Sequence, residues 1–163
     1  MDALLAAEGR IVVTGLGKSG LIGQKIIATL CSTGSPAIFM HAADALHGDL
    51  GSVTSRDVLL AISYSGETRE VLHVTAALRS RGIRILSMVG RHESSLAAAS
   101  DAWLDMDVTR EADPEDMLPT ASEFVTLALG DALAIVLMVE RGYSSRDFAR
   151  NHPGGSLGLR LGS

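Results

Sequence analysis

Three hydroxyl side chains and a glycine lie together in the segment Ser63-Tyr64-Ser65-Gly66-Glu67-Thr68. The segment follows an apolar run at 57–62 and precedes a helical pattern, so we expect a turn between a strand and a helix. Such a turn gathers N–H and O–H groups beside the positive end of a helix dipole, which favours a phosphate. The same residue types also cap helices that bind no ligand. The segment therefore predicts phosphate binding through Ser63, Ser65 and Thr68, with helix capping as the alternative.

A second glycine turn, at residues 15–20, carries a lysine and a serine. It formally matches the dinucleotide pattern G-x-G-x-x-G, but the next expected strand, 37–41, ends without the acidic residue that this pattern requires. It is not a P-loop, because Val12 stands where the first glycine of that motif belongs. We therefore expect Lys18 and Ser19 to offer a charge and donors to a small anion. The alternative for Lys18 is a solvated side chain in a packing turn.

Two histidines are flanked by turn residues rather than placed on an apolar helical face. His47 lies in the stretch LHGDLG at 46–51, and His152 lies in NHPGG at 151–155. A histidine titrates near neutrality and can pass a proton to or from a sugar oxygen, as the opening of a cyclic sugar requires. The alternative for each is a structural histidine bound to a backbone carbonyl. The histidines do not have the close spacing of a preformed metal site, so we predict no required metal.

Three carboxylates lie close to the expected turns. Glu67 and Glu70 come at the start of the helix after the serine segment, where an acid also stabilises the helix dipole, so a structural role is the default for both. Glu111 comes just after the last apolar run. A carboxylate at a strand end would face the crevice and could act as a base on carbon.

The elements that must position these residues alternate along the chain. Several apolar runs lack a polar face, which is typical of parallel strands that are covered by helices on both sides. We predict an α/β three-layer αβα sandwich with a five-stranded parallel sheet. The expected strands are 10–14, 37–41, 57–63, 84–89 and 102–108, and the expected helices are 19–32, 68–81, 93–99, 120–141 and a short one from 144. Ligands collect at the carboxyl ends of such strands, so one crevice should be lined by 15–20, 41–51, 63–70 and 108–119.

Composition limits the class of protein. A length of 163 residues with 47% apolar residues and 17 glycines fits one domain, 1–163, with a core at about 10–161. The net charge of -5, without a basic block, gives no footprint for nucleic acid or an anionic membrane surface. The apolar stretch 125–139 is interrupted by Gly130 and Asp131, so we expect a soluble, cytoplasmic protein with a small-molecule partner. Cys31 is the single cysteine, and we expect it to be a buried packing residue.

Taken together, these residues resemble the sugar isomerase (SIS) domain and, within it, the arabinose 5-phosphate isomerases. The resemblance runs from Ile11 to Leu161. The serine segment marks SIS domains in general, whereas HGDLG together with HPGG is specific to this branch. The matching stretches are VVTGLGKSG at 12–20, ALHGDLG at 45–51, ISYSGET at 62–68, GR and ESS within 90–95, LGDAL at 129–133, DFA at 147–149 and HPGGSLG at 152–158.

The resemblance implies reversible interconversion of D-ribulose 5-phosphate and D-arabinose 5-phosphate, on the route to the Kdo sugar of lipopolysaccharide or capsule. The reaction passes through a cis-enediol(ate) and needs no cofactor. Members are homotetramers with shared sites, so His47 or His152 is expected to act in a neighbouring subunit. Glu111 is the expected base, and Lys18 would stabilise the enediolate. By position, Ser19, Ser63, Ser65 and Thr68 would hold the phosphate, and Lys18, His47, Glu70, Glu111 and His152 would line the sugar and transfer protons.

Two segments depart from the family pattern. Many relatives carry asparagine at the position of Tyr64, and small hydroxylated residues where this chain has the segment 121–125. An isomerase of another sugar phosphate, such as a hexulose 6-phosphate, and a sugar-phosphate sensor without turnover are therefore the alternative functions. Family enzymes often carry extra helices before the first strand and a pair of CBS domains after the catalytic domain. The chain is expected to be a natural short form or the catalytic domain of a longer protein.

Overall fold

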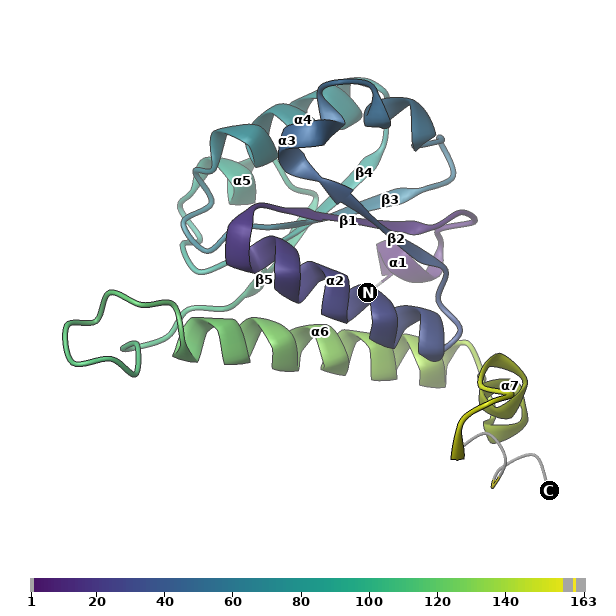
Figure 1. Ribbon diagram of the computed structural model, residues 1–163. Coiled ribbons are helices and arrows are strands. Elements are labelled where there is room, and N and C mark those ends of the chain that lie inside the picture. Colours follow the sequence, from purple (N-terminus) through teal and green to yellow (C-terminus); the bar gives the residue numbers. More distant parts are fainter. Residues whose placement is uncertain (1, 157–159, 161–163) are drawn as a thin grey trace.

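Five parallel strands form the centre of the computed structural model, which describes residues 2–156 and 160 (Figure 1). Their order across the sheet is β2-β1-β3-β4-β5. Two of the three inner strands, β1 and β3, are buried at every position, because helices cover both faces of the sheet. The strands are β1 (Ile11–Gly15), β2 (Ala37–His41), β3 (Val58–Ile62), β4 (Arg84–Val89) and β5 (Ala102–Asp105). The predicted α/β sandwich with a five-stranded parallel sheet is confirmed.

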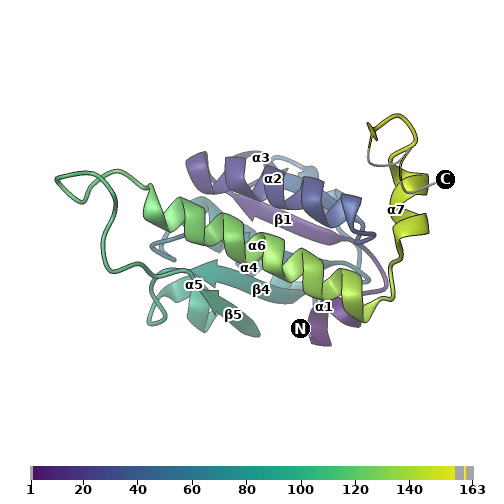
Figure 2. The same cartoon turned by 90° about the horizontal axis from the view of Figure 1, so that it is seen from below.

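Two helical layers enclose the sheet (Figures 1 and 2). The layer that contains the longest helix packs on the sheet through Ile26, Leu30, Leu133 and Leu137. The opposite layer packs through Val71, Val74 and Leu78. The first layer holds α1 (Asp2–Leu5), α2 (Gly17–Ser32) and α6 (Ala121–Glu140), and the second holds α3 (Ala42–Ala45), the 3-10 helix η1 (Asp49–Ser52), α4 (Arg69–Ser80) and α5 (Ser95–Ala98). The last helix, α7 (Ser145–Asn151), lies beyond the end of α6 (Figure 1).

The expected strands and longer helices agree with the structure, except that the last strand, expected over 102–108, is β5 and ends at Asp105. Short elements and one cysteine also differ from the expectation. The elements α1, α3 and η1 were not expected, because four residues are too few for a helical period to be recognised. Cys31 was expected to be buried, and this prediction is wrong, because Cys31 is exposed. The buried face of α2 is formed by Gly20, Gly23, Ile26 and Leu30. Residue 31 directly follows Leu30, and the helical rotation between neighbouring residues turns it away from this face.

The sheet order creates the place where a ligand can bind. From β1, the chain crosses to β2 on one side, and β3 follows on the other side of β1. Connections that leave neighbouring strands in opposite directions open a crevice at the carboxyl ends of those strands. The last residue of β1, Gly15, pairs with the last residue of β3, Ile62. The glycine turn and the serine segment therefore begin side by side.

Helix α6 is unusually apolar. Among the described residues it is the one helix that could cross a membrane by length and composition alone. Its inner face instead packs on α2: a side chain at Gly130 would collide with Ile26, and Asp131 forms an ion pair with Lys25. Its outer face leaves Phe124 74% exposed and Val139 64% exposed. The inner face is therefore that of a core helix, whereas the outer face has no partner in the described chain.

Candidate active site

The serine segment forms a tight, internally bonded turn between β3 and α4. Ser63 is buried, and its Oγ lies 2.9 Å from Oγ1 of Thr68. The Ser63 hydroxyl also accepts a hydrogen bond from the N–H of Gly66 at 3.1 Å, and Gly66 has a φ of 67°, which favours glycine. Ser65 is exposed, and its Oγ accepts the N–H of Glu67 at 3.2 Å. The turn is thus rigid before any ligand binds, with the Ser65 hydroxyl on its surface.

The glycine turn places Lys18 and Ser19 in the first turn of α2. Gly15 and Gly20 approach closely: a Cβ at Gly15 would lie 3.1 Å from the backbone nitrogen of Gly20. A larger residue would push α2 away from β1. Lys18 is exposed and Ser19 is half-buried. The positive end of α2 therefore points toward the carboxyl edge of the sheet, next to the serine turn.

A cavity of about 270 Å³ joins the glycine turn to the serine turn and to the start of α6. Lys18 and Ser19 line it from α2, and Ser122 and Glu123 line it from α6. The full lining is Leu16, Lys18, Ser19, Ile22, Tyr64, Pro119, Ser122, Glu123 and Thr126. The structure thus brings together two of the predicted site residues, Lys18 and Ser19, with one residue of the predicted serine segment, Tyr64.

Tyr64 lines both this cavity and a second one of about 500 Å³. The second cavity also holds Ser65 and the loop after β4, from Gly90 to Ser94. The Tyr64 hydroxyl donates to Oδ1 of Asp107 at 3.1 Å, and the ring lies so close to Gly90 that a Cβ there would collide with it. Burial raises the pKa of Tyr64, and the hydrogen bond to Asp107 adds to the increase. Tyr64 is therefore held in place at the border of both cavities.

Glu111 lies beside the first cavity, and its carboxylate is bound to the start of α6. Its Oε2 accepts the N–H of Thr120 at 2.8 Å, the Thr120 hydroxyl at 3.1 Å and the N–H of Ser122 at 3.2 Å, while Oε1 accepts the Ser122 hydroxyl. Burial raises the pKa of this carboxyl, but the hydrogen bonds from Ser122 and Thr120 outweigh burial and lower the pKa to about 2. In this conformation Glu111 caps α6, and a carboxyl with so low a pKa is a weak base.

Glu123 is a site residue that the sequence did not single out. Its Oε1 lies 3.5 Å from Nζ of Lys18, inside the cavity that both residues line. This oxygen is buried and accepts no hydrogen bond from the part of the chain that the structure describes. A signal for Glu123 was present in the sequence: it is an acidic residue in the first turn of the helix after Pro119, within the segment 121–125 that departs from the family pattern.

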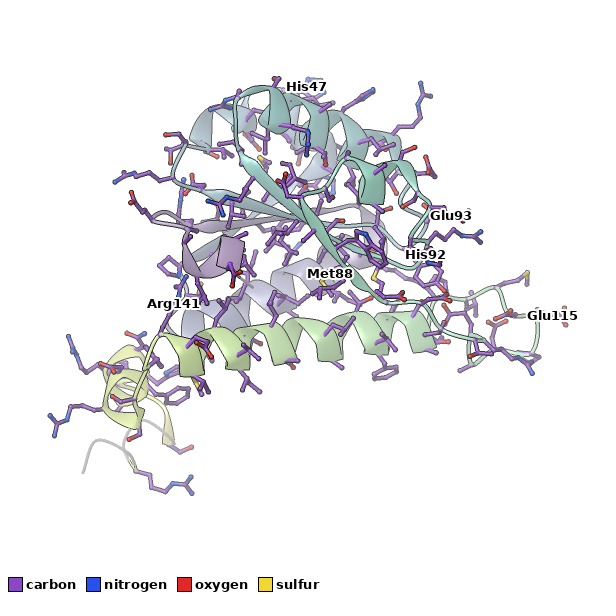
Figure 3. The ribbon with its side chains drawn as sticks, turned by 180° about the vertical axis from the view of Figure 1, so that it is seen from behind. His47, Met88, His92, Glu93, Glu115 and Arg141 are labelled. Carbon is purple, nitrogen blue, oxygen red and sulfur yellow. The ribbon has the colours of Figure 1, made fainter. Side chains whose placement is uncertain are left out.

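The remaining predicted residues lie at different distances from this cavity. Glu70 is half-buried in the first turn of α4, directly after the serine turn. Glu67 has a structural contact, because its Oε1 accepts the N–H of Ser95 at 2.7 Å, which lowers the pKa of Glu67. His47 is exposed at the end of α3, and Figure 3 shows it in the helical layer opposite α6. Among the described residues, His47 does not line the cavity that holds Lys18.

His152 lies at the other end of the molecule. Its ring stacks on Phe148 with centroids 3.9 Å apart, and its Nε2 lies 3.3 Å from Oγ of Ser32. Ser32 ends α2 and Lys18 begins it, so His152 is roughly 20 Å from Lys18 in the same chain at 1.5 Å per helical residue. The histidine stretch continues to Gly158, but residues 157 and 158, like the end of the expected core at 161, lie outside the described residues.

The described residues contain no group of three histidine, cysteine, aspartate or glutamate side chains that could hold a metal ion. The site lies at the carboxyl ends of β1 and β3, where hydroxyls, one lysine and two carboxylates surround a crevice that apolar residues such as Leu16 and Ile22 also line.

A comparison with protein families matches residues 4–136 to the family described as the SIS domain. The chain belongs to the SIS domain family. Among its relatives, the arabinose 5-phosphate isomerases KdsD of Pseudomonas aeruginosa and GutQ of Escherichia coli K12 are each 52% identical over 98% of this chain. These matches cover 49% and 50% of the two relatives, so the chain spans about half of their length.

A solved SIS structure supports the same assignment. The Escherichia coli CFT073 protein c3406, solved in complex with arabinose 5-phosphate, superposes on this chain with a TM-score of 0.90 at 40% identity. The superposition covers 93% of this chain and 81% of that protein. The family expected from the serine segment and the histidine stretches is confirmed.

Proposed function

We propose that this SIS chain interconverts D-ribulose 5-phosphate and D-arabinose 5-phosphate through a cis-enediol(ate), without a cofactor. The observation that carries the proposal is the cavity that joins Lys18 and Ser19 to the serine turn, in a chain that is 52% identical to arabinose 5-phosphate isomerases over 160 residues. A phosphorylated sugar does not cross membranes unaided, so we include a cytoplasmic location in the proposal.

The phosphate end of the substrate would meet uncharged donors. Ser19 lies at the start of α2, and Ser63, Ser65 and Thr68 lie in the adjoining turn between β3 and α4. Hydroxyls and backbone N–H groups at two helix starts bind a phosphate dianion without needing a positive side chain at the same point. Because the turn around Gly66 is already ordered by its own hydrogen bonds, phosphate binding has a smaller entropic cost.

The chemical step moves a proton between two carbons and needs a base and a stabilised oxyanion. Lys18, at the cavity wall, is the group in the proposal that stabilises negative charge on the enediolate oxygens. Glu111 is the proposed base, and it would have to release part of its hydrogen bonding to Thr120 and Ser122 when substrate binds. Glu70, at the start of α4, is the alternative carboxylate.

The proposal includes a homotetramer with shared sites, in which His47 or His152 acts in a neighbouring subunit. The position of His152, at the end of α2 that is far from Lys18, supports His152 as the residue that would serve another chain's site. The apolar outer face of α6, which exposes Phe124, Ile135 and Val139, gives such an assembly a surface to bury. Mixing inactive Lys18→Ala and inactive His152→Ala proteins should restore part of the activity, because some mixed sites then contain both residues.

The decisive experiment is turnover of ribulose 5-phosphate followed by NMR. We expect arabinose 5-phosphate to appear and, in D₂O, deuterium to enter at C2 of the product. Ligand-induced thermal stabilisation without any product would instead identify a sensor. A hexulose 6-phosphate with a higher kcat/KM than ribulose 5-phosphate would reassign the substrate.

A further inference from the structure

Glu123, which forms an ion pair with Lys18, is the charged residue of the cavity that the proposed reaction leaves unused. A lysine is expected in a site for an anionic substrate, but the half-buried carboxylate of Glu123, 3.5 Å from the lysine, opposes anion binding. We propose that Glu123 selects substrates by charge, favouring a sugar with a single phosphate over a sugar bisphosphate or a phosphorylated sugar acid. The inference rests on the proposed function, since it takes a sugar phosphate as the ligand of this cavity.

A second ion pair between the same two helices shows what is unusual about Glu123. Asp131 binds Lys25 with both carboxylate oxygens, and its Oδ1 also accepts the Thr29 hydroxyl at 2.9 Å. Asp131 thus has the contacts expected of a residue that fastens α6 to α2. Glu123, by contrast, leaves a buried oxygen without a hydrogen bond from the described residues, at the wall of a cavity.

A buried acceptor without a donor is unfavourable, so it favours a ligand that supplies one. A sugar hydroxyl beside a carbonyl fits the pair: Lys18 donates to the carbonyl oxygen and Glu123 accepts from the hydroxyl. A second phosphate or a carboxylate at the same end would meet the carboxylate instead. Repulsion of the wrong ligand in this way is a general route to specificity.

The charge of the cavity is what makes this selection work. Lys18 alone would attract any anion to the end of the site away from the phosphate, whereas Glu123 cancels that attraction. In the proposed function the serine turn binds the substrate phosphate with uncharged donors, so phosphate binding there does not depend on the Lys18 charge. Removing the Glu123 charge should therefore strengthen the binding of a second phosphate or a carboxylate near Lys18 far more than the binding of the first phosphate at the serine turn.

The test compares ribulose 5-phosphate with ribulose 1,5-bisphosphate, which differ only in the second phosphate. Calorimetry gives the two dissociation constants for the wild type, for Glu123→Gln, for Glu123→Thr and for the control Asp131→Asn. We expect both Glu123 variants to bind the bisphosphate better relative to the monophosphate by about tenfold or more, as the removal of one nearby charge requires. Asp131→Asn should leave the ratio unchanged.

The possible results separate this inference from the proposed function. An unchanged ratio in Glu123→Gln, with the monophosphate still bound, overturns the inference and leaves the isomerase intact. If the ratio of the two dissociation constants changes in Glu123→Gln but the wild type makes no arabinose 5-phosphate, the isomerase proposal is overturned and the inference is supported. If ribulose 5-phosphate does not bind at all, both are overturned. Should both Glu123 variants unfold, the wild type decides: added salt must weaken the preference for the monophosphate, and a preference independent of salt overturns the inference.

Discussion

Replacement of Glu111 tests how the site is held together. Its carboxylate accepts two backbone N–H groups and two hydroxyls at the start of α6, whereas the N-cap residue Thr120 makes no side-chain cap hydrogen bond of its own. Loss of a helix cap costs about 0.5–2 kcal/mol, and a hydrogen bond to a charged group contributes about 1.5–3 kcal/mol. Because Glu111 is partly open to solvent, these contributions are weakened, and we expect Glu111→Ala to lower the free energy of unfolding by about 2 kcal/mol.

Glu111→Gln keeps one carboxamide oxygen and should lose about 1 kcal/mol. In a chain of this length, about 1 kcal/mol corresponds to a shift in Tm of about 3 °C. Thermal unfolding followed by circular dichroism therefore gives an expected decrease of about 6 °C for Glu111→Ala and about 3 °C for Glu111→Gln. The control is Glu115→Gln, at the exposed tip of the same loop (Figure 3), which should unfold at the wild-type temperature.

The pH dependence follows from the direction of the pKa shift. The pKa of Glu111 falls from 4.5 to about 2 on folding, so its contribution to stability is complete above pH 4.5 and is lost as the pH falls toward 2. The difference in Tm between the wild type and Glu111→Gln should therefore shrink between pH 5 and pH 3. Equal Tm values for the wild type and Glu111→Ala at pH 7 would refute the capping role. A stable Glu111→Gln with intact ligand affinity and no turnover would support Glu111 as the base.

Two further substitutions test the parts of the fold that support the site. Asp57→Asn should lower the free energy of unfolding by about 2 kcal/mol at pH 7, measured by urea unfolding. Burial raises the pKa of Asp57, but the hydrogen bonds from Arg10 and Thr54 outweigh burial and lower the pKa to about 2. The loss of stability should therefore fade below pH 3.8. Gly130→Ala should cost about 1–3 kcal/mol, because the new methyl group collides with Ile26 between α6 and α2. A Gly130→Ala protein that unfolds like the wild type would show that Ile26 can move aside.

Much of the fold follows from local patterns, and this explains which predictions succeeded. The runs that became β1, β3 and β4 are apolar on both faces, a pattern that requires helices on both sides of a parallel sheet. The short elements α1, α3 and η1 and the exposure of Cys31 were missed, whereas α5 lies within the expected helix 93–99. A single turn has no period to read, and the exposure of one residue depends on how far its helix rotates against the sheet.

The site divides in the same way. The sequence by itself determined which residues are candidates for the chemistry: hydroxyls and glycine after β3, and a lysine and a serine at the start of α2. Turn geometry and helix dipoles depend on neighbouring residues, so a local pattern is enough to propose them. Only the tertiary structure decided that Glu111 caps α6, that Glu123 faces Lys18, and that His152 lies far from the site of its own chain. These contacts join segments far apart in the chain. They depend on the order of the strands and on the packing of α6 against α2, which no local pattern encodes.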